Sequence, residues 1–210
     1  MATSRIATAV VASIGIAVAA AVGYGIHKVA KERNQQRAVV SMVGDTTAYL
    51  RSSLKSAPPE TLEKIEGSLR VTKTWNNAEL ADATEQYLVG AREIMRRRAD
   101  ANRLTHKAAA SRSALIAHMQ RSGRRDTPWI HSASVLKRQV ERDHFDLDVQ
   151  LKALADLFEL LPEANKRLAP HVQASLLLDD AARKSARREV LEEQQRASAE
   201  LQKVRSLLPR

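Results

Sequence analysis

Histidines are the residues of this chain best suited to catalysis or metal binding, and their spacing forms no complete site. Glu141 and His144 have the Glu-x-x-His spacing of one half of a di-iron site in a helical bundle. Such a site needs a second pair of this kind and two further glutamates, and the second pair is missing. No two histidines stand four residues apart, and the six are His27, His106, His118, His131, His144 and His171. The sequence therefore predicts no metal ion.

Other signatures of catalysis are also missing. The chain has no cysteine, which excludes a thiolate nucleophile and cysteine-ligated zinc. It contains no glycine-rich phosphate loop and no Gly-x-Ser-x-Gly turn. The acids Asp143, Asp146 and Asp148 lack the glycine and the spacing of a calcium loop. These observations predict a protein that is not an enzyme and that binds no cofactor.

A basic segment from Arg92 to Arg125 is the strongest candidate for binding. It holds ten basic residues against two acids, a local excess of +8 in a chain of net charge +10. A basic stripe on a helix is typical of contact with phosphate, in nucleic acid or anionic lipid. An anionic protein partner, or an acidic neighbouring helix of the same chain, would explain the charge as well. The basic residues are Arg92, Arg96, Arg97, Arg98, Arg103, Lys107, Arg112, Arg121, Arg124 and Arg125.

The N-terminal region contains an uncharged stretch of twenty-one residues, Ile6 to Ile26. As a helix it spans roughly 30 Å, the thickness of the hydrocarbon core of a bilayer. We favour a single transmembrane anchor over a cleaved signal peptide, because the apolar run continues past the small-residue sites near Ala19 and Ala21. A mitochondrial presequence is a third alternative, but it would be amphipathic and rich in arginine.

The charges beside this stretch predict its orientation. Lys28, Lys31, Arg33 and Arg37 follow it, whereas Arg5 precedes it. The positive-inside rule then places the bulk of the chain in the cytoplasm. The high ratio of arginine to lysine and the alanine content favour a bacterial source, and hence the bacterial inner membrane. A periplasmic or extracellular location is the alternative.

Small residues recur every four positions within the apolar stretch, as at Gly15, Ala19 and Gly23. This spacing lets two helix backbones approach closely in a membrane. It predicts packing against a second membrane helix or a second copy of the chain. In an alanine-rich stretch the same spacing also arises by chance.

The rest of the chain has helical periodicity. We expect a helix over Lys28–Val43, a break at Gly44 and Asp45, a short segment Thr46–Ser56, and a helix from Pro59. The chain then divides into an anchor with its basic flank (1–33), a short helical connector (34–75) and a bundle of three long helices (76–210).

The three long helices are predicted at 78–122, 128–161 and 171–208. Asn76 or Asn77 would cap the first, and Pro162 would end the second. Helices with short connections pack antiparallel, so the fold class is all-α, an elongated coiled-coil-like bundle. Arg98 and Arg112 fall within the apolar stripe of the first helix and need an acidic partner or solvent.

The second long helix carries an apolar seam that needs a partner helix, from the same chain or from a second copy. The seam consists of Trp129, Leu136, Val140, Leu147, Leu151, Leu154, Phe158 and Leu161. With no catalytic site in view, we expect a membrane-anchored scaffold, adaptor or accessory subunit that works through protein contacts. A tether for nucleic acid or anionic lipid through the basic segment is one alternative. A periplasmic or extracellular sensor, or an envelope-spanning module, is the other.

Overall fold

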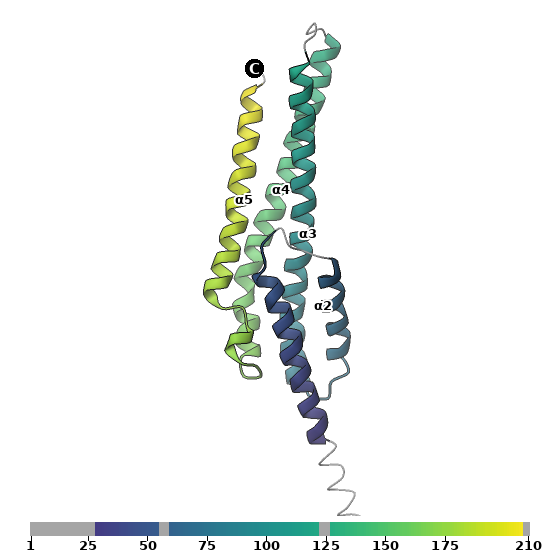
Figure 1. The fold of residues 1–210 in the computed structure, drawn as a ribbon, viewed down its shortest axis with the longest axis vertical. Coiled ribbons are helices and arrows are strands. Elements are labelled where there is room, and N and C mark those ends of the chain that lie inside the picture. The colour runs from purple at the N-terminus through teal and green to yellow at the C-terminus, as the bar shows by residue number, and fades with distance from the viewer. Residues whose placement is uncertain (1–27, 55–58, 122–126, 208–210) are drawn as a thin grey trace, which may run out of the picture. The chain divides into compact units, whose positions relative to one another are not determined.

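The computed structural model describes residues 28–54, 59–121 and 127–207 (Figure 1). The chain divides into two compact units, Met1–Ser41 and Met42–Arg210. All regular structure among the described residues is helical, so the all-α prediction is confirmed. Of the first unit, the described residues 28–41 are helical.

The predicted transmembrane stretch, with Gly15, Ala19 and Gly23, lies outside the described residues. Among the helices that the structure describes, none has both the length and the apolar content needed to cross a bilayer.

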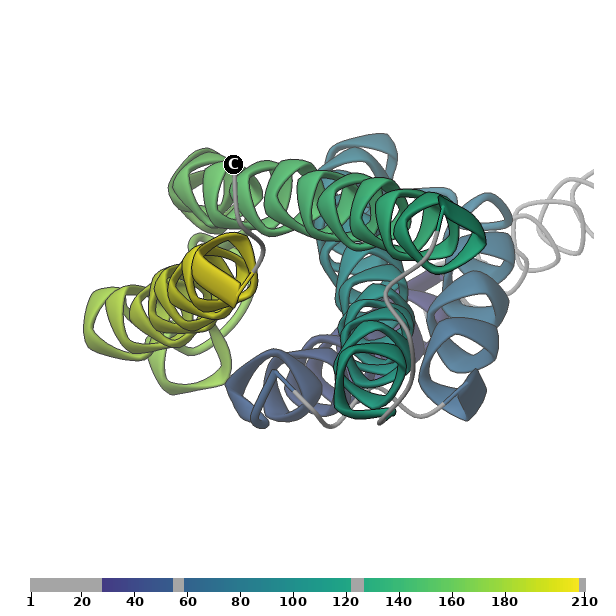
Figure 2. The same ribbon diagram turned by 90° about the horizontal axis from the view of Figure 1, so that it is seen from above.

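The second unit is built on three long helices. They are α3 (Ala78–Gln120), α4 (Thr127–Leu168) and α5 (Asp180–Leu207), and they alternate in direction (Figure 1). The helix α4 packs against both α3 and α5, and the shorter α2 (Pro59–Thr72) packs against α3 (Figures 1 and 2). Residues 42–51 form a further helical segment of this unit.

The start of α3 follows the predicted cap. The side-chain oxygen of Asn77 accepts a hydrogen bond from the Leu80 N–H at 3.1 Å, which satisfies one of the free donors of the first turn. The prediction for the end of α3 agrees within two residues, because the helix ends at Gln120.

The predicted break at Gly44 and Asp45 is wrong, because residues 28–51 are helical without interruption. Glycine closes a helix when it adopts a positive φ, and no described glycine does so. Gly44 lies against Leu176, and a Cβ atom there would stand in ordinary van der Waals contact, 3.5 Å from Cδ2 of Leu176.

The predicted end of the second long helix at Pro162 is also wrong. Pro162 lies inside α4, which continues to Leu168. Proline has no N–H to donate to the carbonyl four residues earlier, here that of Phe158. Nη1 of Arg183 reaches this carbonyl oxygen at 3.5 Å and supplies the missing donor. This contact from an α5 side chain helps α4 to continue as a helix beyond Pro162.

The last helix begins later than predicted. The chain turns after Leu168 and passes through the short 3-10 helix η1 (Ala174–Leu176) before α5 begins at Asp180. Asp179 caps α5, because its Oδ1 accepts from the Ala182 N–H at 2.8 Å. Leu177 and Leu178 of the connecting segment are buried. Their burial and the aspartate cap replace the helix that periodicity predicted over residues 171–179.

Two parts of the core differ in size. Around Tyr87 and Phe158 the buried residues come from residues 42–54, α2, α3, α4 and α5. Farther along α3 and α4 the core is a small cluster of Leu115, Val140 and Val204, with three partly buried apolar neighbours. The α3–α4 hairpin extends past the end of α5 (Figure 1).

Candidate interaction surfaces

The apolar seam of α4 faces the interior. Its members from Val140 to Leu161 are all buried, and Trp129 and Leu136 are partly buried. The ring of Trp129 stacks on His118 with centroids 5.0 Å apart. Since α3 and α5 cover the seam, the partner helices that this pattern requires come from the same chain.

The basic segment does not form one continuous stripe. Arg124 and Arg125 lie outside the described residues, and several of the other eight residues turn toward different neighbours. Arg97 donates to Glu93 at 2.9 Å and to Gln150 at 2.8 Å. The other ion pairs of the segment are Arg103 with Asp100, Lys107 with Asp143, and Arg112 with Glu200.

Arg98 is buried, with 1% of its surface exposed. Its guanidinium donates to the carbonyl oxygens of Tyr49, Leu50 and Ser52 at 3.0, 2.8 and 3.1 Å. These carbonyls stand at the end of the helical segment, where no further helical turn supplies donors. The Tyr49 carbonyl also accepts from the N–H of Ser52 at 3.1 Å. The guanidinium carbon also lies 5.5 Å from the centroid of the Phe158 ring.

The charge of Arg98 survives this burial. Desolvation lowers the pKa of Arg98 to about 10, and the charge of Glu189 opposes the shift. The guanidinium is therefore protonated at neutral pH. The sequence predicted an acidic partner or open solvent for this residue, whereas backbone carbonyls satisfy it. Arg98 thus joins residues 49–52 to α3 and α4.

A second buried charge lies at the contact of α3 and α4. Asp143 is 1% exposed, and its Oδ1 accepts from Lys107 Nζ at 2.8 Å and from Gln139 Nε2 at 2.8 Å. Burial alone would raise the pKa of Asp143, but the bonds from Lys107, Gln139 and Ser111 outweigh it and hold the pKa below its usual value. The carboxylate is therefore ionised at neutral pH.

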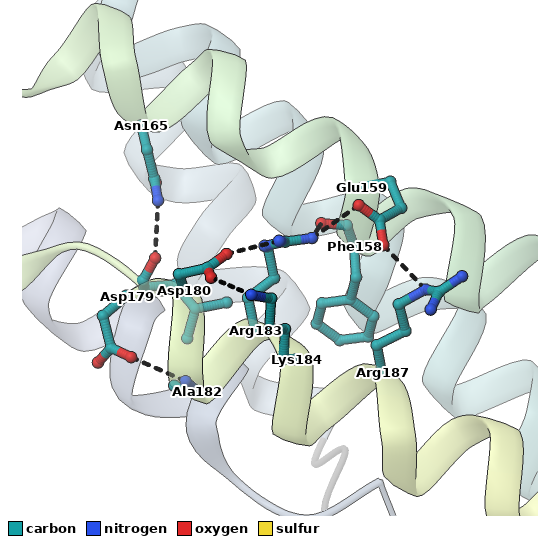
Figure 3. Close-up of polar contacts among 10 residues, drawn as sticks. Phe158, Glu159, Asn165, Asp179, Asp180, Ala182, Arg183, Lys184 and Arg187 are labelled. Carbon is teal, nitrogen blue, oxygen red and sulfur yellow. Dashed lines mark hydrogen bonds and ion pairs between the residues drawn. The ribbon is translucent and has the colours of Figure 1, made fainter.

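A closed polar network joins α4 to the start of α5 (Figure 3). Arg183 pairs with Glu159 at 2.8 Å and with Asp180 at 2.6 Å, and Arg187 pairs with Glu159 at 3.0 Å. Hydrogen bonds from Lys184 and Arg183 lower the pKa of Asp180. Since Glu159 and Asp180 each pair with two cations, the network fixes the α4–α5 junction.

Glu141 and His144 line a hollow of about 250 Å³ between α4 and α5. We call it the α4–α5 hollow. His144 Nδ1 lies 2.9 Å from the carbonyl oxygen of Val140, and Glu141 pairs with Arg205 at 3.4 Å. In the described part of the chain no three potential ligands come close enough to hold a metal ion. Phe145 forms part of the rim.

The outer face of α4 carries a row of exposed large apolar side chains that the sequence analysis did not single out. Their exposed fractions range from 46% to 67%, and the members of this outer row are Val135, Phe145, Val149 and Leu160. At 100° per residue the four lie within an arc of about 80°. Once the buried seam is assigned, a helical wheel of the remaining apolar residues reveals the row.

Exposed charged residues share this face: Arg138 and Arg142 lie within the same arc between Val135 and Phe145, Asp156 lies within it before Leu160, and Lys152 lies just outside it. The structure shows no ion pair to them within the residues it describes. Protein interaction sites combine exposed apolar side chains with charged and polar neighbours. The outer row is therefore the most suitable docking surface of the second unit.

Comparison with known protein families, with characterised proteins and with solved structures finds no match.

Proposed function

We propose that this protein is a non-enzymatic scaffold, adaptor or accessory subunit, anchored in the membrane by Ile6–Ile26 and working through protein contacts. The outer row of α4 carries the proposal. Its four large side chains remain exposed although α4 buries a complete seam on its other side. An apolar row of this kind favours a partner that covers it.

The rest of the second unit supports a scaffolding role. The buried ties of Arg98, Asp143 and Arg183 connect separate helices through groups that are already paired. Such ties hold a fixed surface. The division of the basic segment among several partners speaks against a continuous track for nucleic acid.

The first test is the location of the chain. A C-terminal tag on the full-length protein is exposed to protease in intact cells and in spheroplasts, and the untreated band is sized on the same gel. A protected tag on a full-length band supports an anchored protein with its bundle in the cytoplasm. A digested tag favours the periplasmic or extracellular alternative, and a band shortened by about two dozen residues favours a cleaved signal peptide.

The second test addresses the docking surface. The double variant Phe145→Ser and Leu160→Ser is compared with the matched control Val71→Ser and Val89→Ser, which removes exposed apolar groups from α2 and α3. After cross-linking in native membranes, we expect the α4 variant to lose the cross-linked complexes that the wild type and the control form. Equal complexes in all three proteins would refute docking on the outer row.

A further inference from the structure

A second hollow, of about 200 Å³, lies between α2 and α3. We call it the α2–α3 hollow. Glu66, Leu69, Arg70, Lys73 and Arg92 line it. Three cations against one carboxylate leave a net charge of +2 at the lining. Only Arg92 belongs to the basic segment of the sequence analysis, so the hollow brings together cations that are distant in the sequence.

The antiparallel course of α2 and α3 explains this convergence (Figure 1). Helix side chains lean toward the N-terminus of their own helix. Arg92 therefore leans along α3 toward the turn that joins the two helices, whereas Arg70 on α2 leans away from that turn. Arg70, Lys73 and Arg92 all line the hollow.

These cations differ from most of the basic segment in having no partner. Arg97, Arg103, Lys107 and Arg112 each pair with an acid. Within the described residues, no hydrogen bond or ion pair is found for the side chains of the three lining cations. Exposed Arg96 adds a further positive charge one helical turn from Arg92. Neighbouring like charges destabilise a helical surface, and a bound anion would relieve that repulsion.

We propose that the α2–α3 hollow binds a phosphate monoester group. Such a group carries about −1.5 to −2 charges at neutral pH, which balances the +2 of the lining. Arginine presents a planar fork of donors that matches the oxygens of a phosphate. Pockets for whole small molecules span about 300 to 1,000 Å³. The smaller, open hollow therefore has room for the phosphate group and leaves the remainder of its carrier in solvent.

Two sources share this chemistry, a soluble phosphorylated solute and the headgroup of a lipid such as phosphatidic acid. The full-length protein in a non-ionic detergent is titrated calorimetrically with inorganic phosphate. In parallel it is titrated with micelles that carry phosphatidic acid, and with phosphatidylcholine micelles as the control. Saturable binding of inorganic phosphate assigns the site to a soluble ligand, and binding of phosphatidic acid alone assigns it to a headgroup. Binding of neither overturns the proposal.

Variants connect the binding to the hollow. The double variant Lys73→Gln and Arg92→Gln should weaken binding by about tenfold or more, because each charged hydrogen bond stabilises the complex. The matched control Arg188→Gln and Lys203→Gln removes two exposed cations from α5 and should change the affinity less than about twofold. An equal loss in both double variants would show that only net charge matters and would overturn the site.

A gain of affinity separates this site from a folding defect. Glu66 is the only carboxylate among the described lining residues, and it repels a bound anion. Glu66→Gln should therefore tighten phosphate binding several-fold, which a misfolded protein does not do. Weaker binding by this variant would overturn the arrangement proposed here. The site is independent of docking on α4, so its failure leaves the proposed function intact.

Discussion

The second unit has two halves that are stabilised in different ways. In the half around Arg98, five parts of the chain contribute to a core with fully buried Tyr87 and Phe158. In the half around Leu115, the described core residues come from α3, α4 and α5, and the cluster consists of Leu, Val and Met side chains. We call these the thick half and the thin half. A thinner core buries less apolar surface, so ion pairs make up a larger share of its stabilisation.

Arg98 and Arg112 illustrate the difference, since both lie in the same stripe of α3 two heptads apart. Arg98 in the thick half is buried and holds the end of a helix through its carbonyls. Arg112 in the thin half is partly exposed and pairs with Glu200 of α5. The neighbouring backbone or side chain, and not the position in the stripe, decides how each arginine is satisfied.

The largest effect is expected for Arg98→Met. Methionine fills much of the volume but takes the buried donor away from the Leu50 carbonyl and one donor each from the carbonyls of Tyr49 and Ser52. A buried group left unsatisfied costs about 1–3 kcal/mol. We expect a loss of about 3–5 kcal/mol in the free energy of unfolding, in line with the removal of one partner from a buried charged contact. Denaturation of the full-length protein in a non-ionic detergent, followed by circular dichroism, measures it.

The matched control is Arg96→Met, which changes an exposed arginine two positions away and should alter stability by less than about 0.5 kcal/mol. Arg98→Lys should lie between the two, because an ammonium group keeps the charge without the fork of donors. If Arg98→Met proves as stable as Arg96→Met, the thick half does not depend on this contact.

In the thin half, Lys107→Met should cost about 2 kcal/mol at pH 7, because it leaves the buried Asp143 carboxylate without its cation. The folded pKa of Asp143 lies below the unfolded value near 3.8. Its contribution is therefore complete above the unfolded pKa and is lost as the pH falls through the folded pKa. The difference between wild type and variant should shrink toward acidic pH.

Unfolding curves from pH 7 down to about pH 2 test this dependence, because the contribution is lost only below the unfolded pKa near 3.8. Lys152→Met serves as the control, since Lys152 lies exposed on α4. A constant difference across this pH range would mean that lost packing of the lysine stem, and not the ion pair, explains the effect.

Local signals in the sequence predicted the elements that depend on local chemistry. Apolar periodicity found the three long helices, and Asn77 marked the start of α3. The errors fall where a distant residue decides the outcome. Pro162 stays helical because Arg183 reaches its helix from α5, and α5 starts at Asp180 because of the Asp179 cap and the burial of Leu177 and Leu178.

The candidate surfaces were likewise predictable only where residues of one helix form the whole pattern. The seam of α4 was readable because one helix contains its whole pattern. The α2–α3 hollow was not, because Arg70 and Arg92 stand on different helices and meet only after those helices pack. The outer row was not predicted, because apolar residues outside a seam can be identified as exposed only when the buried face of the helix is known.

A third prediction tests the contact that spans α4 and α5. Pro162→Ala restores the N–H that can donate to the Phe158 carbonyl and should stabilise the protein by about 1 kcal/mol. The gain stays below the roughly 3 kcal/mol typical of proline in a helix interior, because Arg183 already supplies a donor. Thermal unfolding of the variant gives the shift.

A double-mutant cycle isolates the role of Arg183 at this carbonyl. Arg183→Met should cost about 0.5–1 kcal/mol less in the Pro162→Ala background than in the wild type. Its pairs with Glu159 and Asp180 remain in both backgrounds and cancel in the cycle. Strict additivity would show that the proline is tolerated without help from Arg183.

The smallest effect is expected for Gly67→Ala in α2, which belongs to the thick half. A Cβ atom at Gly67 would meet no other atom within 4 Å, so the variant gains helix propensity without a clash. We expect a stabilisation of about 0.5–1 kcal/mol.

Hydrogen exchange in this variant then distinguishes the two halves, because the exchange rate should fall for amides that open only by global unfolding. If the thin half opens by itself, the amides around Leu115 should exchange at the wild-type rate while those around Tyr87 become slower. Equal slowing at both places would mean that the two halves unfold as one cooperative unit.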